Sequence, residues 1–159
     1  VWEKWKMAMT NIEIAKELAI LVELDMDAIQ AYSRAIPCIG STSVKDLLIR
    51  FRQDHERHVE QLSAVIRALD VLPPSPGADR PGCSGQTPAA VDVELAEEGA
   101  LQMIRFHEEL ATSNYGSSSG LDLTPNIKEL VMENYQDEQV HLRFISGVLA
   151  GRAWQRRDS

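Results

Sequence analysis

The feature that most constrains the fold of this chain is an internal repeat with an offset of 83 residues. The segment 137–141 (Asp-Glu-Gln-Val-His) lies 83 positions after the segment 54–58 (Asp-His-Glu-Arg-His). Because repetition at a fixed offset is typical of a duplicated structural unit, we expect two copies of one helical hairpin. The same offset pairs further polar and apolar residues: Asp25 with Glu108, Tyr32 with Tyr115, Leu18 with Leu101, Leu48 with Val131 and Leu62 with Ile145.

Four segments carry apolar residues at the spacing of an α-helix. The sequence therefore predicts helices over residues 11–36, 44–69, 91–115 and 126–150. At about 1.5 Å per residue, each of these helices would be about 37 Å long. The third helix is the least regular of the four because Gly99 interrupts it.

The connections between the predicted helices indicate the topology. Residues 37–43 contain proline, glycine and hydroxyl residues that end the first helix and cap the second. Residues 116–120 (Gly-Ser-Ser-Ser-Gly) are expected to form a flexible break before the fourth helix. Residues 70–90, rich in proline and glycine, are long enough to run the length of a bundle. We therefore expect an all-α fold, a single four-helix bundle domain over residues 1–159 with a long crossover between helices 2 and 3.

The apolar rows of the four helices contain six polar side chains of the kinds that bind metals: Asp25, His55, His58, Glu108, Glu138 and His141. An isolated carboxylate in an apolar core is costly unless it is protonated, paired or bound to a cation. A single core histidine is more often a hydrogen-bonded structural residue, and Tyr32 and Tyr115 taken alone are ordinary core aromatics. Because the repeat places acid, imidazole and tyrosine at equivalent depths in both halves, we expect a metal site.

Other polar residues near these rows receive different interpretations. His107 has only Leu24 as its repeat partner, so it is interpreted as structural or as a support for a ligand. Glu97 and Glu98 lie early in the third helix, where we expect solvated acids that compensate the helix dipole.

Composition and charge exclude several classes of protein. A net charge of −8 argues against a nucleic-acid binder, which needs a basic surface. The longest apolar run, residues 18–22, is too short to cross a membrane. Cys38 and Cys83 lie in separate connections without C-x-x-C spacing, so we expect free thiols in a cytoplasmic protein, with a disulfide between them as the less favoured alternative.

In its polar positions the sequence resembles the ferritin-like superfamily, whose dimetal site takes a Glu from each of two helices and a Glu-x-x-His from each of the other two. Asp25-x6-Tyr32 matches the first helix of bacterioferritin and rubrerythrin-like proteins, and the segment 137–141 matches their last helix. Glu108 and His58 fill the remaining positions. Asp137 is not a metal ligand in that arrangement, so the resemblance implies that its repeat partner Asp54 orients an imidazole. The resemblance extends over essentially the whole bundle and implies one or two iron ions, with manganese or zinc as alternatives.

The sequence departs from that superfamily at two ligand positions. Asp25 stands in place of a glutamate, and His55 stands in place of a bridging glutamate. Only Glu138 is then well placed to bridge two cations, so the nitrogen-rich set favours a single Fe, Mn or Zn ion over a pair. Glu56 stands where bacterioferritin has its haem-binding methionine, which argues against haem. The absence of a fifth predicted helix weakens the case for a 24-subunit cage.

Two functions remain open at this point. The resemblance implies iron-dependent oxidation by O2 or peroxide, in the manner of a ferroxidase or peroxidase, with Tyr32 or Tyr115 hydrogen-bonding a ligand or passing an electron. The alternative is a non-enzymatic bundle whose metal or polar core is structural. Such a bundle would act by oligomerisation or partner binding, for which Trp2, Trp5 and the basic residues 152–159 are candidates. We expect a homo-oligomer, and a dimer rather than a cage.

Overall fold

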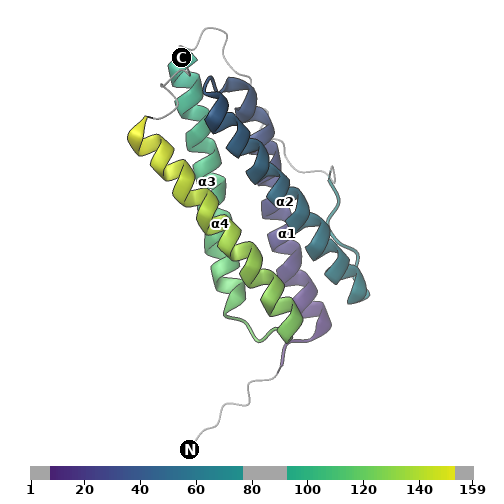
Figure 1. Ribbon diagram of the computed structural model, residues 1–159. Coiled ribbons are helices and arrows are strands. Elements are labelled where there is room, and N and C mark those ends of the chain that lie inside the picture. The colour runs from purple at the N-terminus through teal and green to yellow at the C-terminus, as the bar shows by residue number, and fades with distance from the viewer. Residues whose placement is uncertain (1–7, 77–92, 153–159) are drawn as a thin grey trace, which may run out of the picture.

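Residues 8–76 and 93–152 are described by a computed structural model of the protein (Figure 1). They form four long α-helices and one short 3₁₀ helix, and no β-strand occurs among them. The prediction of an all-α four-helix bundle is confirmed. In chain order the elements are α1 (Asn11–Ala35), η1 (Ile36–Cys38), α2 (Thr42–Ala68), α3 (Val93–Ser119) and α4 (Pro125–Gly151).

The contacts between helices define the topology of the bundle. α1 packs mainly against α2 and α3, and α3 also packs against α4, whereas α2 and α4 touch sparsely. Tyr32 near the end of α1 contacts Glu108, while Asp25 earlier in α1 contacts Tyr115 later in α3, so α1 and α3 run antiparallel. α1 and α2 also run antiparallel (Figure 1). α2 and α3 therefore point the same way, which is the arrangement that requires a crossover. Most of that connection, residues 77–92, lies outside the described residues.

Local interactions explain where three of the helices begin. Thr10 caps α1 by accepting the N–H of Glu13, and the Glu13 carboxylate accepts the N–H of Thr10 in return. Ser41 accepts the N–H of Val44 at the start of α2. α4 begins at Pro125, whose missing N–H has no helical partner in the first turn anyway. The bounds of these three helices lie within two residues of the predicted ones.

The third helix differs most from its prediction. α3 continues through Ser119 instead of ending at residue 115, so the predicted flexible break at residues 116–120 is wrong. Gly99, expected to interrupt this helix, lies within it. A Cβ added to Gly99 would meet no atom within 4 Å, which places this glycine on an open surface.

Small residues near the end of α3 serve close packing rather than flexibility. A Cβ on Gly116 would lie 3.2 Å from the ring of Tyr135 on α4. Ser118 is fully buried, and its hydroxyl donates a hydrogen bond to Glu17 on α1 at 2.7 Å. Glycine and serine at these positions let α3 approach both neighbouring helices.

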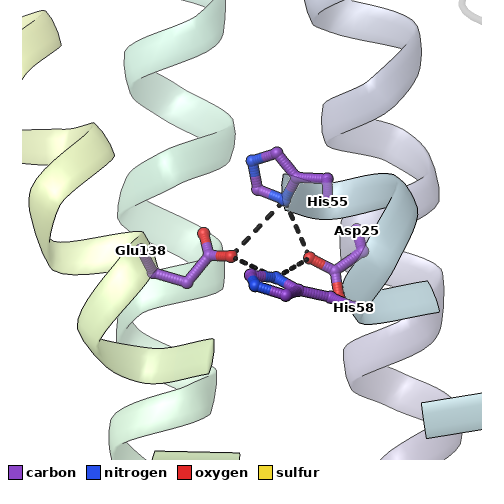
Figure 2. Close-up of side chains that lie close together, drawn as sticks. All are labelled: Asp25, His55, His58 and Glu138. Atoms are coloured by element: carbon purple, nitrogen blue, oxygen red, sulfur yellow. Dashed lines mark hydrogen bonds and ion pairs between the residues drawn. The ribbon is translucent and has the colours of Figure 1, made fainter. Parts of the chain in front are cut away.

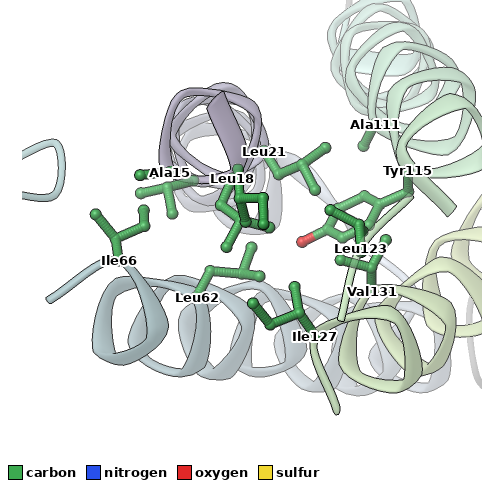
Figure 3. Packing of buried hydrophobic residues seen from close by; sticks show 12 residues of the cluster. Ala15, Leu18, Leu21, Leu62, Ile66, Ala111, Tyr115, Leu123, Ile127 and Val131 are labelled. Atoms are coloured by element: carbon green, nitrogen blue, oxygen red, sulfur yellow. The ribbon is translucent and has the colours of Figure 1, made fainter. Parts of the chain in front are cut away.

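The apolar core consists of two clusters with a polar layer between them. α1 contributes residues 14–22 to the first cluster and residues 32–35 to the second, and Asp25 lies between the two. The first cluster includes Ala15, Leu18, Leu21, Leu62, Ile66, Tyr115, Ile127 and Val131 (Figure 3). The second includes Tyr32, Ile39, Leu48, Phe51, Leu101, Ile104 and Ile145. The two clusters shield the polar layer from water at both ends.

None of the described helices is both long enough and apolar enough to cross a membrane.

Candidate metal centre

The bundle brings together all six side chains that the sequence singles out as possible metal ligands. α1 supplies Asp25, α2 supplies His55 and His58, α3 supplies Glu108, and α4 supplies Glu138 and His141. Each of them is at most 1% exposed. They form two overlapping groups in which one ligand atom per residue lies within 4.8 Å of every other.

The first group contains Asp25, His55, His58 and Glu138 (Figure 2). Asp25 Oδ1 lies 2.8 Å from His55 Nδ1 and 3.5 Å from His58 Nδ1. Glu138 Oε1 faces the same two nitrogens at 3.4 Å and 3.1 Å, respectively. Two carboxylate oxygens and two imidazole nitrogens therefore point toward one another from three helices.

The second group contains His55, Glu108, Glu138 and His141. His55 turns its other nitrogen, Nε2, toward Glu108 Oε1 at 3.0 Å. Glu108 Oε2 lies 3.7 Å from His141 Nδ1. His55 and Glu138 belong to both groups, so they stand between the two possible cation positions.

Two buried tyrosines hold the outer carboxylates in place. The Tyr32 hydroxyl donates a hydrogen bond to Glu108 Oε1 at 2.5 Å, and the Tyr115 hydroxyl donates to Asp25 Oδ2 at 2.6 Å. Burial, together with the adjacent carboxylates, raises the pKa of both phenols well above the usual value. Each tyrosine therefore keeps its proton and fixes one carboxylate from the facing helix.

Two aspartates and one arginine bind the outer sides of two imidazoles. His58 Nε2 donates to Asp137 Oδ2 at 3.2 Å, and His141 Nε2 donates to Asp54 Oδ2 at 3.1 Å. Arg57 links both acids, with contacts of 2.6 Å to Asp54 and 2.7 Å to Asp137. Since Nε2 of each imidazole carries the donated proton, Nδ1 faces the centre and offers a lone pair to a cation once the ring has given up its second proton. Asp54 thus contacts an imidazole as expected for an orienting residue.

His55 is bonded differently from the other two histidines. Both of its ring nitrogens lie in hydrogen-bond geometry with carboxylate oxygens, of Asp25 and of Glu108. A neutral imidazole has only one N–H, so both bonds require the imidazolium form. Burial opposes this charge, but the charges of Glu138 and Glu108 outweigh it and raise the pKa of His55 well above its usual value.

The remaining titratable groups show how the buried charges balance. Burial opposes ionisation of Asp25, but hydrogen bonds from His55 and His58 leave its pKa lower than usual. Burial also opposes charge on His58, yet the hydrogen bond to Asp137 and the nearby carboxylates of Asp25 and Glu138 raise its pKa to about 10. Burial raises the pKa of Glu138 to about 7, and the nearby carboxylates of Glu108 and Asp25 contribute to this increase. Glu138 is therefore the carboxylate that most needs a further positive charge.

The buried ligand atoms fit a bound cation. Several of them have no hydrogen-bond partner: His58 Nδ1, His141 Nδ1, Glu108 Oε2 and both carboxylate oxygens of Glu138. Burying such groups unpaired costs about 1–3 kcal/mol each, and more when they are charged. Two ligands that lie about 2.0–2.2 Å from one ion, at octahedral or tetrahedral angles, are about 2.8–3.6 Å apart. The first group shows separations of 2.8 to 3.5 Å.

The structure corrects or completes several other interpretations. Glu97, expected in solvent, is 8% exposed, because Gly40 lacks the Cβ that would lie 2.9 Å from its carboxylate oxygen. His107 lies outside both groups of ligands. Cys38 is exposed, and Cys83 lies outside the described residues.

Sequence reasoning overlooked Arg57 and Asn134. The repeat offset pairs Arg57 with Val140, and it pairs the buried Asn134 with Phe51. These residues differ between the two halves, so a search for matching positions passes over them. The signal that could have found them is a polar residue whose repeat partner is apolar, Val140 for Arg57 and Phe51 for Asn134.

The fold and the buried polar groups together define a class of protein: a ferritin-like four-helix bundle with carboxylate and histidine groups that could hold a metal ion. The family model described as "Domain of unknown function (DUF2383)" matches residues 13–78, which include most of α1 and all of α2. No curated protein matches the sequence.

Two solved structures resemble this chain. One is a two-domain protein from Anabaena variabilis that contains DJ-1/ThiJ/PfpI-like and ferritin-like domains; the match has 14% identity and a TM-score of 0.71, and covers 94% of this chain. This chain spans 40% of the length of that protein. The other is a conserved hypothetical protein from Mycobacterium tuberculosis, with 14% identity, a TM-score of 0.72, and coverage of 94% of this chain and 99% of that one. At this level of identity the likeness shows a shared ferritin-like fold.

Proposed function

We propose that this protein binds iron and uses it for oxidation by O2 or peroxide, in the manner of a ferroxidase or peroxidase. The observation that carries the proposal is the set of buried carboxylate and imidazole groups that the four helices bring to one place, several of whose atoms have no hydrogen-bond partner. In this proposal the metal ligands are Asp25, His55, His58, Glu108, Glu138 and His141.

The donor set guides the choice of metal. Carboxylate oxygens and imidazole nitrogens suit Fe(II), and they also accept manganese or zinc. Bound iron would supply the electrons that reduce O2 or peroxide. His55 must release one of its two N–H protons before that nitrogen can bind a cation. We therefore propose that one ion binds first, in one of the two overlapping groups, and that a second binds more weakly.

Tyr32 and Tyr115 are the proposed catalytic side chains. Each hydroxyl lies one hydrogen bond from a ligand carboxylate, and each ring is buried. This position would let either phenol donate a hydrogen bond to a small reactant or pass an electron to the centre. Their first role is to keep Glu108 and Asp25 oriented toward the imidazoles.

Anaerobic addition of Fe(II) followed by air tests the proposal, with absorbance and oxygen uptake as readouts. We expect uptake in proportion to the iron bound by the unmodified protein. Glu138→Gln, which removes the carboxylate common to both groups, should abolish most of this uptake. Glu133→Gln on the exposed face of the same helix is the matched control and should behave like the unmodified protein. Equal uptake by both variants would contradict the proposal.

A second candidate function rests on the bonding of His55. Its imidazolium form joins Asp25 to Glu108 without any metal, so the polar core can partly satisfy itself. In that case the bundle would be structural and would act by oligomerisation or partner binding; Trp2 and Trp5 lie outside the described residues. This alternative predicts that the purified protein carries no metal and consumes no oxygen. Elemental analysis tests the first point, and light scattering tests the proposed homo-oligomer.

A further inference from the structure

The repeat places two unlike residues at the middle of the candidate metal centre. The offset of 83 residues relates His55 on α2 to Glu138 on α4. These are the two residues that belong to both groups of possible ligands. Each group is completed by two residues of its own: Asp25 and His58 in the first, Glu108 and His141 in the second. His55 and Glu138 are therefore the residues that could each serve two cations.

Two of the three histidines in the centre use only one ring nitrogen toward the other possible ligands. His58 and His141 each donate from Nε2 to an aspartate on the outer side of the centre, at 3.2 Å and 3.1 Å. Their Nδ1 atoms face the inner carboxylates. While its outer bond is kept, each of these imidazoles can bind one cation.

His55 turns both of its ring nitrogens inward. Nδ1 lies 2.8 Å from Asp25 Oδ1 and 3.4 Å from Glu138 Oε1, in the first group. Nε2, on the other edge of the ring, lies 3.0 Å from Glu108 Oε1, in the second group. The side chain is fully buried. One ring thus presents a nitrogen to each of the two groups.

The separations around His55 suit either a proton or a cation between nitrogen and oxygen. A distance of 2.8 or 3.0 Å is that of an N–H···O bond. It is also within the range for two ligands of one ion, each about 2.0–2.2 Å from it. A cation on each side would displace one N–H proton to solvent, as metal binding to imidazole generally does. The ring is then an imidazolate, with one negative charge and a lone pair on each nitrogen.

We propose that His55 bridges two cations, one in each group, through its two ring nitrogens. The inference rests on the proposed metal binding and adds how the two ions are joined. The second ion binds more weakly than the first because it must displace the remaining proton of the ring. With the whole ring between them, the two ions lie about 6 Å apart, since a metal–nitrogen bond of about 2.0–2.1 Å extends from either edge. In ordinary two-metal sites the ions are only about 3.5–4 Å apart.

The separation of the two ions tests this inference without any turnover. Crystals of the protein soaked in Co(II) at increasing concentrations give the positions and occupancies of the ions by anomalous scattering. In solution, Cu(II) is the probe, because it accepts imidazole and carboxylate ligands. An isolated Cu(II) ion gives an electron paramagnetic resonance signal, whereas two Cu(II) ions joined by an imidazolate pair their spins and lose it at low temperature.

We expect two cobalt peaks per chain, about 6 Å apart, on opposite edges of the His55 ring. The copper signal of the unmodified protein should rise over the first equivalent and fall over the second. His55→Asn removes the two-sided ring, so its copper signal should not fall on further addition. His107→Asn is the matched control, because it makes the same replacement outside both groups and should behave like the unmodified protein.

Two cobalt peaks about 3.5–4 Å apart would overturn the inference and assign the bridge to the carboxylate of Glu138. A single peak at saturating cobalt would also overturn it, and so would a copper signal that falls in His55→Asn as it does in the unmodified protein. In each of these cases the proposed metal binding stands. If the unmodified protein binds neither cobalt nor copper, the proposed function fails together with this inference.

Discussion

His55 is the residue at which the centre departs most from the ferritin-like arrangement. A glutamate in its place would add negative charge between two cations, whereas the imidazolium donates one N–H to Asp25 and the other to Glu108. Only Glu138 then remains as a carboxylate shared by the two groups. If the proposed metal binding holds, the charge at this one side chain would set how many cations the centre could hold.

Replacing His55 by glutamate should raise the number of bound ions. We expect His55→Glu to bind two divalent ions per chain where the unmodified protein binds one tightly, because a bridging carboxylate offsets the repulsion between them. Isothermal titration with Mn(II) and elemental analysis measure the stoichiometry. His107→Glu makes the same replacement outside both groups and should leave the stoichiometry unchanged. A stoichiometry of one in His55→Glu would contradict this account.

The stability of the metal-free protein should fall as the pH rises above neutrality. The pKa of His58 is about 10 in the folded protein against 6.5 for an ordinary histidine, and that of Glu138 is about 7 against 4.5. A group with a raised pKa adds stability below its unfolded-state value and loses it as the pH passes its folded-state value. The stability that protonated Glu138 contributes is thus lost between pH 4.5 and about 7, and the stability that protonated His58 contributes is lost between pH 6.5 and about 10.

Melting curves of chelator-treated protein at pH 6, 7.5 and 9 test this expectation, and the melting temperature should decline along the series. Carboxylates with lowered pKa values, such as Asp25, have reached their full contribution by pH 6 and do not affect the trend. Metal affinity should move the opposite way and increase with pH, because cations compete with protons for the same nitrogens and oxygens. A melting temperature that rises from pH 6 to pH 9 without metal would contradict the assignment of charges.

At the scale of helices, Arg57 joins α2 to α4 along their sparse interface. Its guanidinium bonds to Asp54 on its own helix and to Asp137 on the other, and these acids hold His141 and His58. An exposed ion pair alone contributes little to stability. This one also orients two ligand imidazoles, so its removal should affect metal binding more than folding.

We expect Arg57→Ala to weaken metal affinity about tenfold to a hundredfold, the range found for residues that orient metal ligands, while lowering the melting temperature only slightly. Competition with a fluorescent chelator measures the affinity. Arg105→Ala is the matched control, because Arg105 pairs with Glu109 on the surface of α3 without contacting a ligand. Loss of affinity in both variants would contradict an orienting role.

Two glycines in α3 give a paired test of how this helix packs. Gly99 faces open space, so Gly99→Ala should stabilise the protein by about 0.5–1 kcal/mol through helix propensity. Gly116→Ala gains the same propensity but places its Cβ 3.2 Å from the ring of Tyr135. We expect this crowding to cancel the gain and to lower the melting temperature. Urea unfolding of both variants measures the change in the free energy of unfolding. Combining Gly116→Ala with Tyr135→Leu relieves the contact and should recover part of the stability lost in Gly116→Ala.

The whole molecule shows what the sequence could and could not predict. The repeat predicted four helices and the burial of the six polar residues, because apolar periodicity and a constant offset can be read directly from the sequence. It did not predict that the Gly-Ser-rich end of α3 is helical, since the close approach of Tyr135 and Glu17 is a tertiary property. Nor did it predict that Arg57 would join Asp54 to Asp137, which depends on a contact between helices.

A cation at the centre should stabilise the entire bundle, because its proposed ligands come from all four helices and separate in the unfolded chain. Binding to the folded state alone contributes about 2.7 kcal/mol when the free metal is 100 times the dissociation constant. For a chain of this size, each kcal/mol raises the melting temperature by about 2–4 °C. We therefore expect Mn(II) to raise the melting temperature of the metal-free protein by about 5–10 °C and a chelator to reverse it.

The same pair of variants at the carboxylate of α4 localises this effect. Glu133→Gln should retain the full shift, and Glu138→Gln should lose most of it, because Glu138 is buried in both groups whereas Glu133 is exposed. Scanning calorimetry with and without Mn(II) measures both shifts. A full shift in Glu138→Gln would place the cation elsewhere on the molecule. No shift in the unmodified protein would leave the imidazolium of His55 as the only positive charge that joins Asp25 to Glu108, and would favour the structural alternative.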